Sequence, residues 1–294
     1  MAGNGGHNVG KHDAKWKAKE ARQALRVGEG FDLSAVDPAS TPGFGGKKED
    51  GERALARDAQ HLSDLQEMFF AGSRHGDTRT VLLVLQGMDT SGKGGVVRHV
   101  VGAIDPQGVE LTAFKAPTKA ELSHGFLWRV RGRLPGAGMI GVFDRSHYED
   151  VLIGRVQQLA PADEIEHRYD LINDFERDVA GDDTTIIKVM LHISKEEQRE
   201  RLRKRLDRPD KYWKFDPGDI DQRMRWDDYL EAYQAALTRT STEHAPWFVV
   251  PADHKWYARL AVQHLLLHAL SGMDLAWPPA DFDIETQKQR LADS

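Results

Sequence analysis

A glycine-rich segment around one lysine is the part of the sequence whose residue types and spacing point most directly to chemistry. It runs Gly87-Met-Asp-Thr-Ser-Gly-Lys-Gly-Gly95, after an apolar run at 80–86 and before an apolar stretch at 96–104. In the spacing G-x-x-x-x-G-K, glycines let backbone N–H groups turn toward a phosphate, and the lysine adds a mobile cation. A chance glycine-rich turn is the alternative, but the position between a predicted strand and a predicted helix favours a phosphate-binding loop. The candidate ligands are Gly87, Gly92, Lys93, Gly94 and Gly95.

Two departures from the usual loop indicate a metal ion. Gly94 stands where ordinary loops of this kind carry the Ser or Thr that binds Mg²⁺, and Asp89 lies inside the loop. A carboxylate beside bound phosphates repels them unless a divalent cation lies between the two. Asp89 is therefore expected to hold the metal in place of the missing hydroxyl, with an aspartate that only caps the turn as the structural alternative.

A second acidic position ends the apolar run at 139–144. Ligands of open α/β sheets bind at the carboxyl ends of strands, so Asp144 is predicted to be the second metal ligand and Arg145 to contact a phosphate. Asp144 as a helix N-cap is the alternative. For Glu149 the sequence leaves two roles open, a group of the phosphate site or a partner of a helix dipole.

Basic residues dominate the segment that follows the apolar run at 184–193. Ser194 and Glu197 have the S-x-x-E spacing of a capping box, which predicts a helix start. A solvated helix face with pairs such as Glu200–Lys204 is one interpretation of the charges. The acidic residues are too few to neutralise the segment, which favours a lid over phosphates at about 195–220. Its cations between 199 and 214 are Arg199, Arg201, Arg203, Lys204, Arg205, Arg208, Lys211 and Lys214.

Short apolar runs alternate with helical patterns along the chain, which predicts βαβ units and a parallel sheet in an α/β fold. The expected strands cover 80–86, 109–115, 139–144, 184–193 and 247–250. The expected helices include 119–134, 147–159, 164–179, 220–237 and 256–270. We expect an N-terminal arm at 1–50 that is ordered only where it packs, one domain at 51–280 and a tail at 281–294.

Composition excludes several classes of protein. The 294 residues are 40% hydrophobic and 29% charged, which is typical of a globular chain, and no apolar run is long enough to cross a bilayer. Cysteine is absent, which rules out disulfides, thiolate metal sites and cysteine nucleophiles. A net charge of −6 gives no support to nucleic-acid binding. We expect a soluble, cytoplasmic protein without a membrane partner.

Six segments in order resemble the family-2 polyphosphate kinases, and the similarity runs from about residue 22 to 280. They are Gly-x-Asp-x-x-Gly-Lys-Gly at 87–94, Phe-Lys-Ala-Pro-Thr at 114–118, Phe-Leu-Trp-Arg at 126–129, Phe-Asp-Arg-Ser-His-Tyr-Glu-Asp at 143–150, the basic segment at 195–214, and Pro-Trp-Phe-Val-Val-Pro-Ala-Asp-His-Lys-Trp at 246–256. The resemblance implies a three-layer P-loop kinase fold similar to thymidylate kinase, with a five-stranded parallel sheet and a helical lid.

The same resemblance implies phosphoryl transfer between inorganic polyphosphate and nucleoside mono- or diphosphates, with AMP and ADP as the main acceptors and guanine nucleotides as a second choice. It implies Mg²⁺, with Mn²⁺ as an alternative, held by Asp89 and Asp144, and a homo-oligomer, a dimer or tetramer. Phosphate contacts are implied for Lys93, Arg145, Arg155, Arg201, Arg205, Arg208, Lys211 and Lys214, with Lys115 on the acceptor phosphate.

Three other functions are alternatives to this one. An ATP-dependent nucleoside monophosphate kinase would use the same loop and lid but needs an adenine pocket for the phosphoryl donor. A non-catalytic module that binds polyanions or nucleotides would bind without turnover. A nucleic-acid binder is disfavoured because the basic segment lacks interleaved aromatic residues and a known motif.

Overall fold

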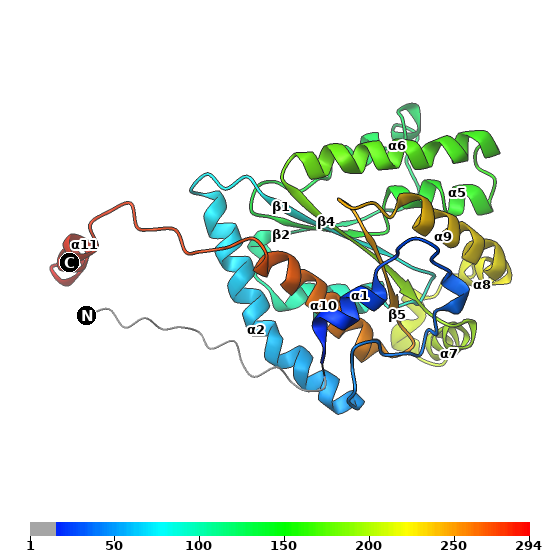
Figure 1. Cartoon of the computed structure of the whole chain (residues 1–294), viewed down its shortest axis with the longest axis horizontal. Helices are drawn as coiled ribbons and strands as arrows, with labels where there is room; N and C mark the ends of the chain where they lie inside the picture. The colour runs from blue at the N-terminus through cyan, green and yellow to red at the C-terminus, as the bar shows by residue number, and fades with distance from the viewer. Residues whose placement is uncertain (1–15) are drawn as a thin grey trace.

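Five parallel strands form the centre of the molecule (Figure 1), and the computed structural model describes residues 16–294. The strand order is β2-β3-β1-β4-β5, and all neighbours pair in parallel. The predicted α/β fold is confirmed, and each predicted strand differs from the observed one by at most two residues at either end. The strands are β1 (Thr80–Gln86), β2 (Val109–Ala113), β3 (Ile140–Asp144), β4 (Thr184–His192) and β5 (Trp247–Pro251).

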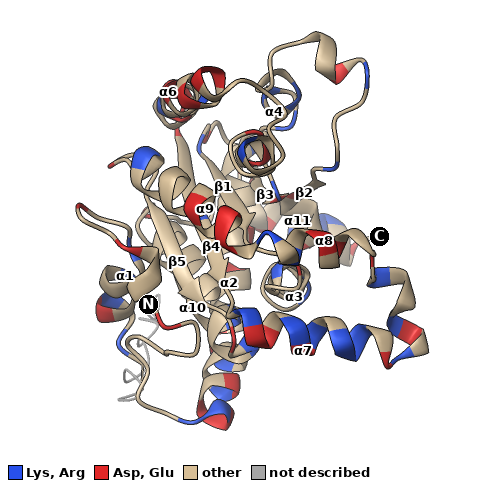
Figure 2. Ribbon diagram, turned by 90° about the vertical axis from the view of Figure 1, so that its right-hand side faces the viewer, with Lys and Arg blue, Asp and Glu red and all other residues tan. Residues whose placement is uncertain are grey.

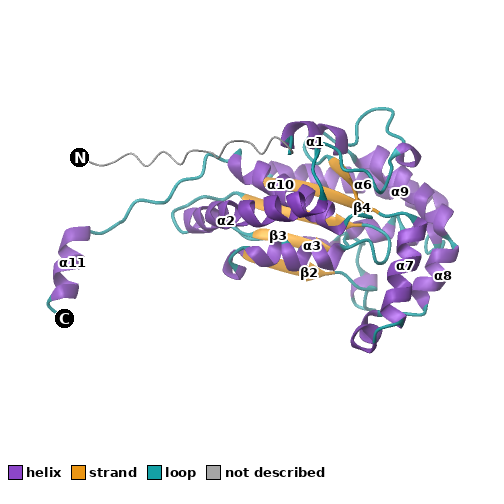
Figure 3. Ribbon diagram, turned by 90° about the horizontal axis from the view of Figure 1, so that it is seen from below, coloured by secondary structure: helices purple, strands orange, loops and turns teal. Residues whose placement is uncertain are grey.

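Strand β1 explains why the chain forms a three-layer sandwich. All seven of its residues are buried, as expected for a central strand with both faces covered. Side chains alternate across a strand, so Leu83 and Leu85 enter one hydrophobic cluster while Leu82 and Val84 enter the other. The sheet therefore separates two apolar cores, each closed by helices (Figure 3).

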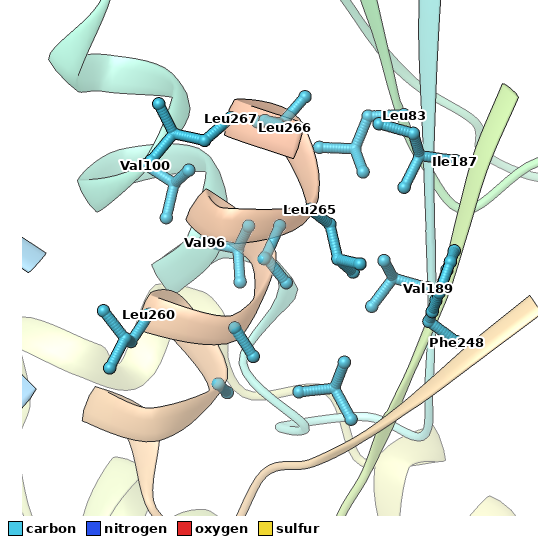
Figure 4. Packing of buried hydrophobic residues seen from close by; sticks show 14 of the residues in the cluster. Leu83, Val96, Val100, Ile187, Val189, Phe248, Leu260, Leu265, Leu266 and Leu267 are labelled. Carbon is cyan, nitrogen blue, oxygen red and sulfur yellow. The ribbon is translucent and has the colours of Figure 1, made fainter. Parts of the chain in front are cut away.

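One core lies between the sheet and a layer of four helices. Figure 4 shows part of it, where Leu260 and Leu265 of the last of these helices approach Val96 and the strand residue Val189. The four helices are α1 (Ala18–Leu25), α2 (Lys48–Ser73), α3 (Lys93–His99) and α10 (Lys255–Ser271).

The other core is covered by α5 (Ile153–Val156), α6 (Ala162–Gly181) and α9 (Trp226–Thr240). A basic helix, α7 (Lys195–Leu206), follows β4 and continues into the 3-10 helix η6 (Pro209–Lys214) and then α8 (Gly218–Met224).

Three of the predicted helices are shorter or broken. The stretch 119–134 contains only a 3-10 turn at Glu121–Ser123 and α4 (Trp128–Arg131), because Gly125 and Gly132 interrupt it. The stretch 147–159 divides into the 3-10 helix η5 (His147–Asp150) and α5, since the residues between them turn inward to the core. The stretch 220–237 breaks at Arg225 into α8 and α9.

The described part of the N-terminal arm packs on the body. Trp16, Leu25 and Phe44 are buried in the first core. The backbone N–H of Val27 donates a hydrogen bond of 2.9 Å to the carbonyl of Trp247, so the arm covers the outer edge of β5. Residues 1–15 of the predicted arm lie outside the described residues.

The C-terminal helix α11 (Ile284–Ala292) falls within the predicted tail and stands clear of the body (Figures 1 and 3). Between residues 16 and 294 the structure contains no helix with the length and apolarity that a membrane crossing requires.

Candidate active site

The site lies where the chain leaves two neighbouring strands for opposite faces of the sheet. After β1 it enters α3 on one face, and after β3 it enters η5 and α5 on the other. Leu85 and Asp144 are paired at the ends of these strands. Such a reversal leaves a crevice beyond the carboxyl ends of the strands, where open α/β sheets bind ligands. A cavity of about 620 Å³ occupies this place.

The glycine loop forms the floor of the cavity. Gly87 and Gly92 have φ angles of 146° and 119°, a region open to glycine but not to residues with a Cβ. Lys93 is the first residue of α3, and its Nζ donates a hydrogen bond of 2.6 Å to the carbonyl of Gly87. Gly92, Lys93, Gly94 and Gly95 all line the cavity, as predicted from the spacing; Gly87 does not.

Arg145 connects the loop to the end of β3. Its φ of 64° is unusual for a residue with a side chain, and its N–H donates to the carbonyl of Leu85. One guanidinium nitrogen lies 2.9 Å from Asp89 Oδ1 and another 3.9 Å from Glu149 Oε2. Although burial acts against the charged form, Glu149 and Asp89 raise the pKa of Arg145. Asp89, Asp144 and Arg145 share the cavity.

Glu149 itself does not line the cavity, and its contact with Arg145 makes it a support for that arginine. Burial raises the pKa of the Glu149 carboxyl, although Arg145 and Lys93 act in the opposite direction.

Asp219 on α8 is a third carboxylate of the cavity, and the sequence did not single it out. Arg205 donates a hydrogen bond of 3.2 Å to it, while burial and the negative charge of Asp89 raise the pKa of Asp219 to about 6. The sequence contained no signal for it, because Asp216, Asp219 and Asp221 are equally plausible surface residues of a turn and a short helix.

Arg201 was expected to reach phosphate from a lid. It lines the cavity, and the structure shows that it also anchors the glycine loop. The residue is 5% exposed, and all of its N–H groups are used within the protein. They donate to the carbonyls of Thr90, Ser91, Ala252 and Asp253 and to the carboxylate of Glu197. Thr90 has a φ of 65°, so Arg201 stabilises a strained part of the glycine loop.

Other contacts fix the first turns of α7 in the same way. Ser194 Oγ accepts from the N–H of Glu197, which confirms half of the predicted capping box. The Glu197 carboxylate does not complete the box because it accepts from Arg201 instead. Gln198 donates to the carbonyl of Asp89. The start of the predicted lid is thus anchored to the loop, and Glu200 pairs with Arg203 rather than with Lys204.

The outer part of the predicted lid contributes the remaining expected cations. Arg205, Arg208, Lys211 and Lys214 all line the cavity. Lys211 and Arg208 lower the pKa of Asp210 to about 2. The lid residue Trp213 is 77% exposed, so this part has little apolar packing to hold it in place.

Four further cations line the cavity and were not among the predicted site residues. They lie on α3, α7 and α10, two of them on a helix far along the sequence. Lys204 belongs to the basic segment, whose composition does not show which of its cations face the site. Each of the other three is a single basic residue among apolar ones, which gives no pattern to find. These residues are Arg98, Lys204, Lys255 and Arg259.

Two predicted residues lie away from the cavity. Arg155 is 3.2 Å from Glu166 on α6 and lines neither this cavity nor the next one described. Its position in α5, on the second-core side of the sheet, explains the separation. Lys115 also lines neither cavity, although its carbonyl accepts a hydrogen bond of 2.7 Å from Arg129. His147 is buried against Glu176, which gives it a structural role.

A second cavity of about 380 Å³ lies beside Arg129. It mixes charged and apolar groups, unlike the first. Arg129 packs 5.4 Å from the centre of the Phe114 ring, and Arg168 packs 5.3 Å from that of Phe126. Its walls include Pro117, Leu122, His124, Phe126, Asp150 and Leu171.

The carboxylates of the first cavity suit a hard cation. Residues 16–294 contain no group of three or more His, Cys, Asp or Glu placed to hold a metal by themselves. Mg²⁺ commonly takes one or two protein carboxylates and completes its shell with water and substrate phosphates. Asp89 and Asp144 on one cavity wall fit that pattern.

The chain has the fold and site of a P-loop kinase. In its open parallel sheet, a glycine loop with a lysine follows the strand β1, an aspartate ends the neighbouring strand, and a basic helix lies beside them. The family model described as "Polyphosphate kinase 2 (PPK2)" matches residues 45–277. The chain belongs to the polyphosphate kinase 2 family.

Relatives agree with this assignment. The chain is 46% identical to the AMP/ADP-polyphosphate phosphotransferase of Meiothermus ruber, over 84% of this chain and 91% of that protein. It is 42% identical to the ADP-polyphosphate phosphotransferase of Rhodopseudomonas palustris, over 86% and 91%. The crystal structure of polyphosphate kinase 2 from Arthrobacter aurescens superposes with a TM-score of 0.91 at 57% identity, covering 94% of this chain and 98% of that one.

Proposed function

We propose that this protein transfers a phosphoryl group between inorganic polyphosphate and AMP or ADP. The names of the relatives from Meiothermus ruber and Rhodopseudomonas palustris support the reaction. The observation that carries the proposal is the lining of the first cavity, in which eleven lysines and arginines face three aspartates. The cations are Lys93, Arg98, Arg145, Arg201, Lys204, Arg205, Arg208, Lys211, Lys214, Lys255 and Arg259.

This lining favours polyphosphate over ATP as the phosphoryl donor. A donor nucleotide needs a flat apolar surface for its base, as ligand pockets generally provide. Among the described residues, the apolar side chains that line the cavity are Val96 and Ala258, and no aromatic ring is present. A bare polyanion needs only repeated cationic contacts, which this cavity supplies.

The residues act by position and charge. Lys93 and the outer cations such as Arg205 neutralise the phosphoanhydride chain, and Arg145 at the end of β3 contacts the phosphoryl group that moves. One terminal anhydride bond of the donor breaks as the acceptor phosphate oxygen forms a new one. That oxygen is already a nucleophile, so no side chain need remove a proton, consistent with the structural role of His147.

A metal ion is part of the proposal. Asp89 and Asp144 would hold Mg²⁺, or Mn²⁺ in its place, since both carboxylates line the donor cavity. The ion, when bound, neutralises charge on the phosphates. Burial and the negative charge of Asp89 raise the pKa of Asp219 to about 6, and this gathering of carboxylates supports a cation there.

The acceptor nucleotide is proposed to bind in the second cavity, where Phe126 and Leu122 offer apolar surface and Arg129 a positive charge. Lys115, next to Arg129, remains a predicted contact of the acceptor phosphate. We propose adenine as the main base, with guanine as a second.

The family resemblance also supports a homo-oligomer, a dimer or tetramer, and we propose a cytoplasmic location, which the absence of cysteine fits. Light scattering of the purified protein measures the mass of the assembly.

Product analysis tests the function directly. Purified protein is incubated with polyphosphate, Mg²⁺ and either AMP, ADP or GDP, without ATP, and nucleotides are separated by ion exchange. We expect ADP and ATP from the adenine acceptors, and no product with Lys93→Ala. Lys48→Ala removes an exposed lysine that pairs with Glu52 and serves as the control. Binding without any product would favour the non-catalytic module.

A further inference from the structure

The two ends of the donor cavity differ in charge. At the end formed by β1, β3 and α8, the three carboxylates of Asp89, Asp144 and Asp219 lie among the cations. Helices α3 and α10 form the other end and contribute only positive charges to the lining, Lys93 at the start of α3 and then Arg98, Lys255 and Arg259. Figure 2 shows the basic residues along α7 as blue segments below α3 in that view.

The charges at the cationic end act on one another. Burial, followed by the positive charges of Arg201 and Lys204, lowers the pKa of Lys255. Burial, Arg201 and Arg98 likewise lower the pKa of Arg259. Two acids act in the opposite direction, Glu197 on Lys255 and Glu52 on Arg259. Each of these acids forms its ion pair with another residue, Glu197 with Arg201 and Glu52 with Lys48.

An ordinary basic surface does not account for this arrangement. Several exposed arginines elsewhere on the described chain are paired with acids, as Arg177 is with Asp174 and Arg203 with Glu200. Arg98, Lys255 and Arg259 gather without such partners around one end of a cavity, and Arg259 lies against Gly95 of the glycine loop. Clustered like charges of this kind are stabilised by binding an anion.

We infer that Arg98, Lys255 and Arg259 bind the part of the polyphosphate chain that lies beyond the reacting phosphates, and that they set the preference for long donors. The inference rests on the proposed function. The reacting end of the polymer lies over Lys93, between Asp89 and Arg145, and the chain continues along α3 toward α10. A short donor such as tripolyphosphate fills the first end alone, whereas a long chain reaches both.

The test compares donors of two lengths. The double variant Arg98→Gln/Lys255→Gln removes two exposed side chains, and Arg259→Gln removes the half-buried one. For each, KM is measured with long-chain polyphosphate and with tripolyphosphate at saturating ADP and Mg²⁺. We expect the KM for the long donor to rise about tenfold in the double variant and that for tripolyphosphate to change less than about twofold.

The salt dependence of KM is a second measurement, and a purely structural effect of the substitutions would not change it. Binding of a linear polyanion weakens with salt in proportion to the number of phosphate contacts, so the dependence of log KM on log salt for the long donor should become shallower in the double variant. Arg177→Gln, an exposed arginine on α6, is the matched control and should change neither slope nor KM.

The outcomes separate the two proposals. An equal rise in KM for both donors, or an unchanged KM for the long one, overturns the inference while leaving the transferase function in place. Absence of transfer by the wild-type protein with either donor overturns the function and the inference with it.

Discussion

Arg145 and Asp89 form an ion pair across the carboxyl ends of β1 and β3, with a guanidinium nitrogen 2.9 Å from Oδ1 of the carboxylate. Each comes from a loop with strained backbone, since Arg145 has a φ of 64° and Thr90, next to Asp89, a φ of 65°. The pair orients one carboxylate oxygen of Asp89, a residue that lines the cavity. The proposed metal ligand is thus fixed before substrate binds.

Replacing Asp89 with Asn tests that role. The amide keeps the shape and can still accept from Arg145, but it carries no charge to hold a divalent cation. We expect kcat to fall by about 100-fold or more while the melting temperature changes little. Asp174→Asn, at an exposed acid on α6, is the control. A fully active Asp89→Asn protein would remove Asp89 from the metal site.

Arg201 and Arg205 are neighbours on α7 with different predicted effects. Arg201→Lys loses most of the contacts to the loop carbonyls, so the free energy of unfolding should fall by about 2–4 kcal/mol, and activity with it. Arg205→Lys should lower activity but change unfolding by less than about 1 kcal/mol, since Arg205 is partly exposed. Urea titration and transfer assays measure both, and equal stability losses would contradict the distinction.

Gly51 is required by the contact of α2 with α10. A Cβ at this position would overlap the indole ring of Trp256. Gly51→Ala should therefore destabilise the protein by about 1–3 kcal/mol through overpacking, despite the better helix propensity of alanine. Gly72→Ala in the same helix meets Asp77 at an ordinary distance of 3.6 Å and should be neutral or stabilising. Thermal unfolding of the two variants compares them directly.

His192 on β4 should make stability depend on pH. Burial lowers its pKa in the folded state below the ordinary value of about 6.5, which the unfolded chain keeps. Below about pH 6.5 the unfolded state binds a proton at His192 that the folded state does not bind. The contribution of neutral His192 to the free energy of unfolding is therefore complete above this pH and is lost as the pH falls. Urea titrations at about pH 7.5 and 5.5 measure how far the free energy of unfolding falls between these two values. The fall should be smaller by about 1 kcal/mol in His192→Gln than in the wild-type protein. An identical loss in both proteins would assign the effect to other groups.

Sequence reasoning grouped correctly those cavity residues that lie in contiguous segments of the chain. Residues 89–95 of the glycine loop line one cavity with Asp144 at the end of β3, because β1 and β3 are neighbours in a parallel sheet. The predicted lid contributes Arg201, Arg205, Arg208, Lys211 and Lys214 to the same cavity. These positions depend on local pattern and on one rule of α/β topology.

The positions of the site residues that the sequence analysis missed depend on how elements far apart in the chain pack together. Arg259 reaches the loop because α10 packs beside α3. Asp219 reaches the cavity because α8 lies against α7, which it contacts through Arg205 and Arg223. Arg155 was misplaced for the complementary reason: a basic residue near the site in sequence lies on α5, beside Glu166. The anchoring of Arg201 could not be foreseen either, since its acceptors are backbone carbonyls, which residue types do not show.

Arg129 should affect the acceptor nucleotide and not the polymer. It lines the second cavity, packs against Phe114 and donates to the carbonyl of Lys115. Arg129→Gln should raise the KM for AMP about fivefold to tenfold, through loss of a charge-assisted contact, with the KM for polyphosphate unchanged. Arg131→Gln, on the same helix but directed at Phe175, is the matched control. An equal rise in the KM for AMP and the KM for polyphosphate would contradict the assignment of separate substrates to the two cavities, because loss of a contact in one cavity would then weaken binding in both.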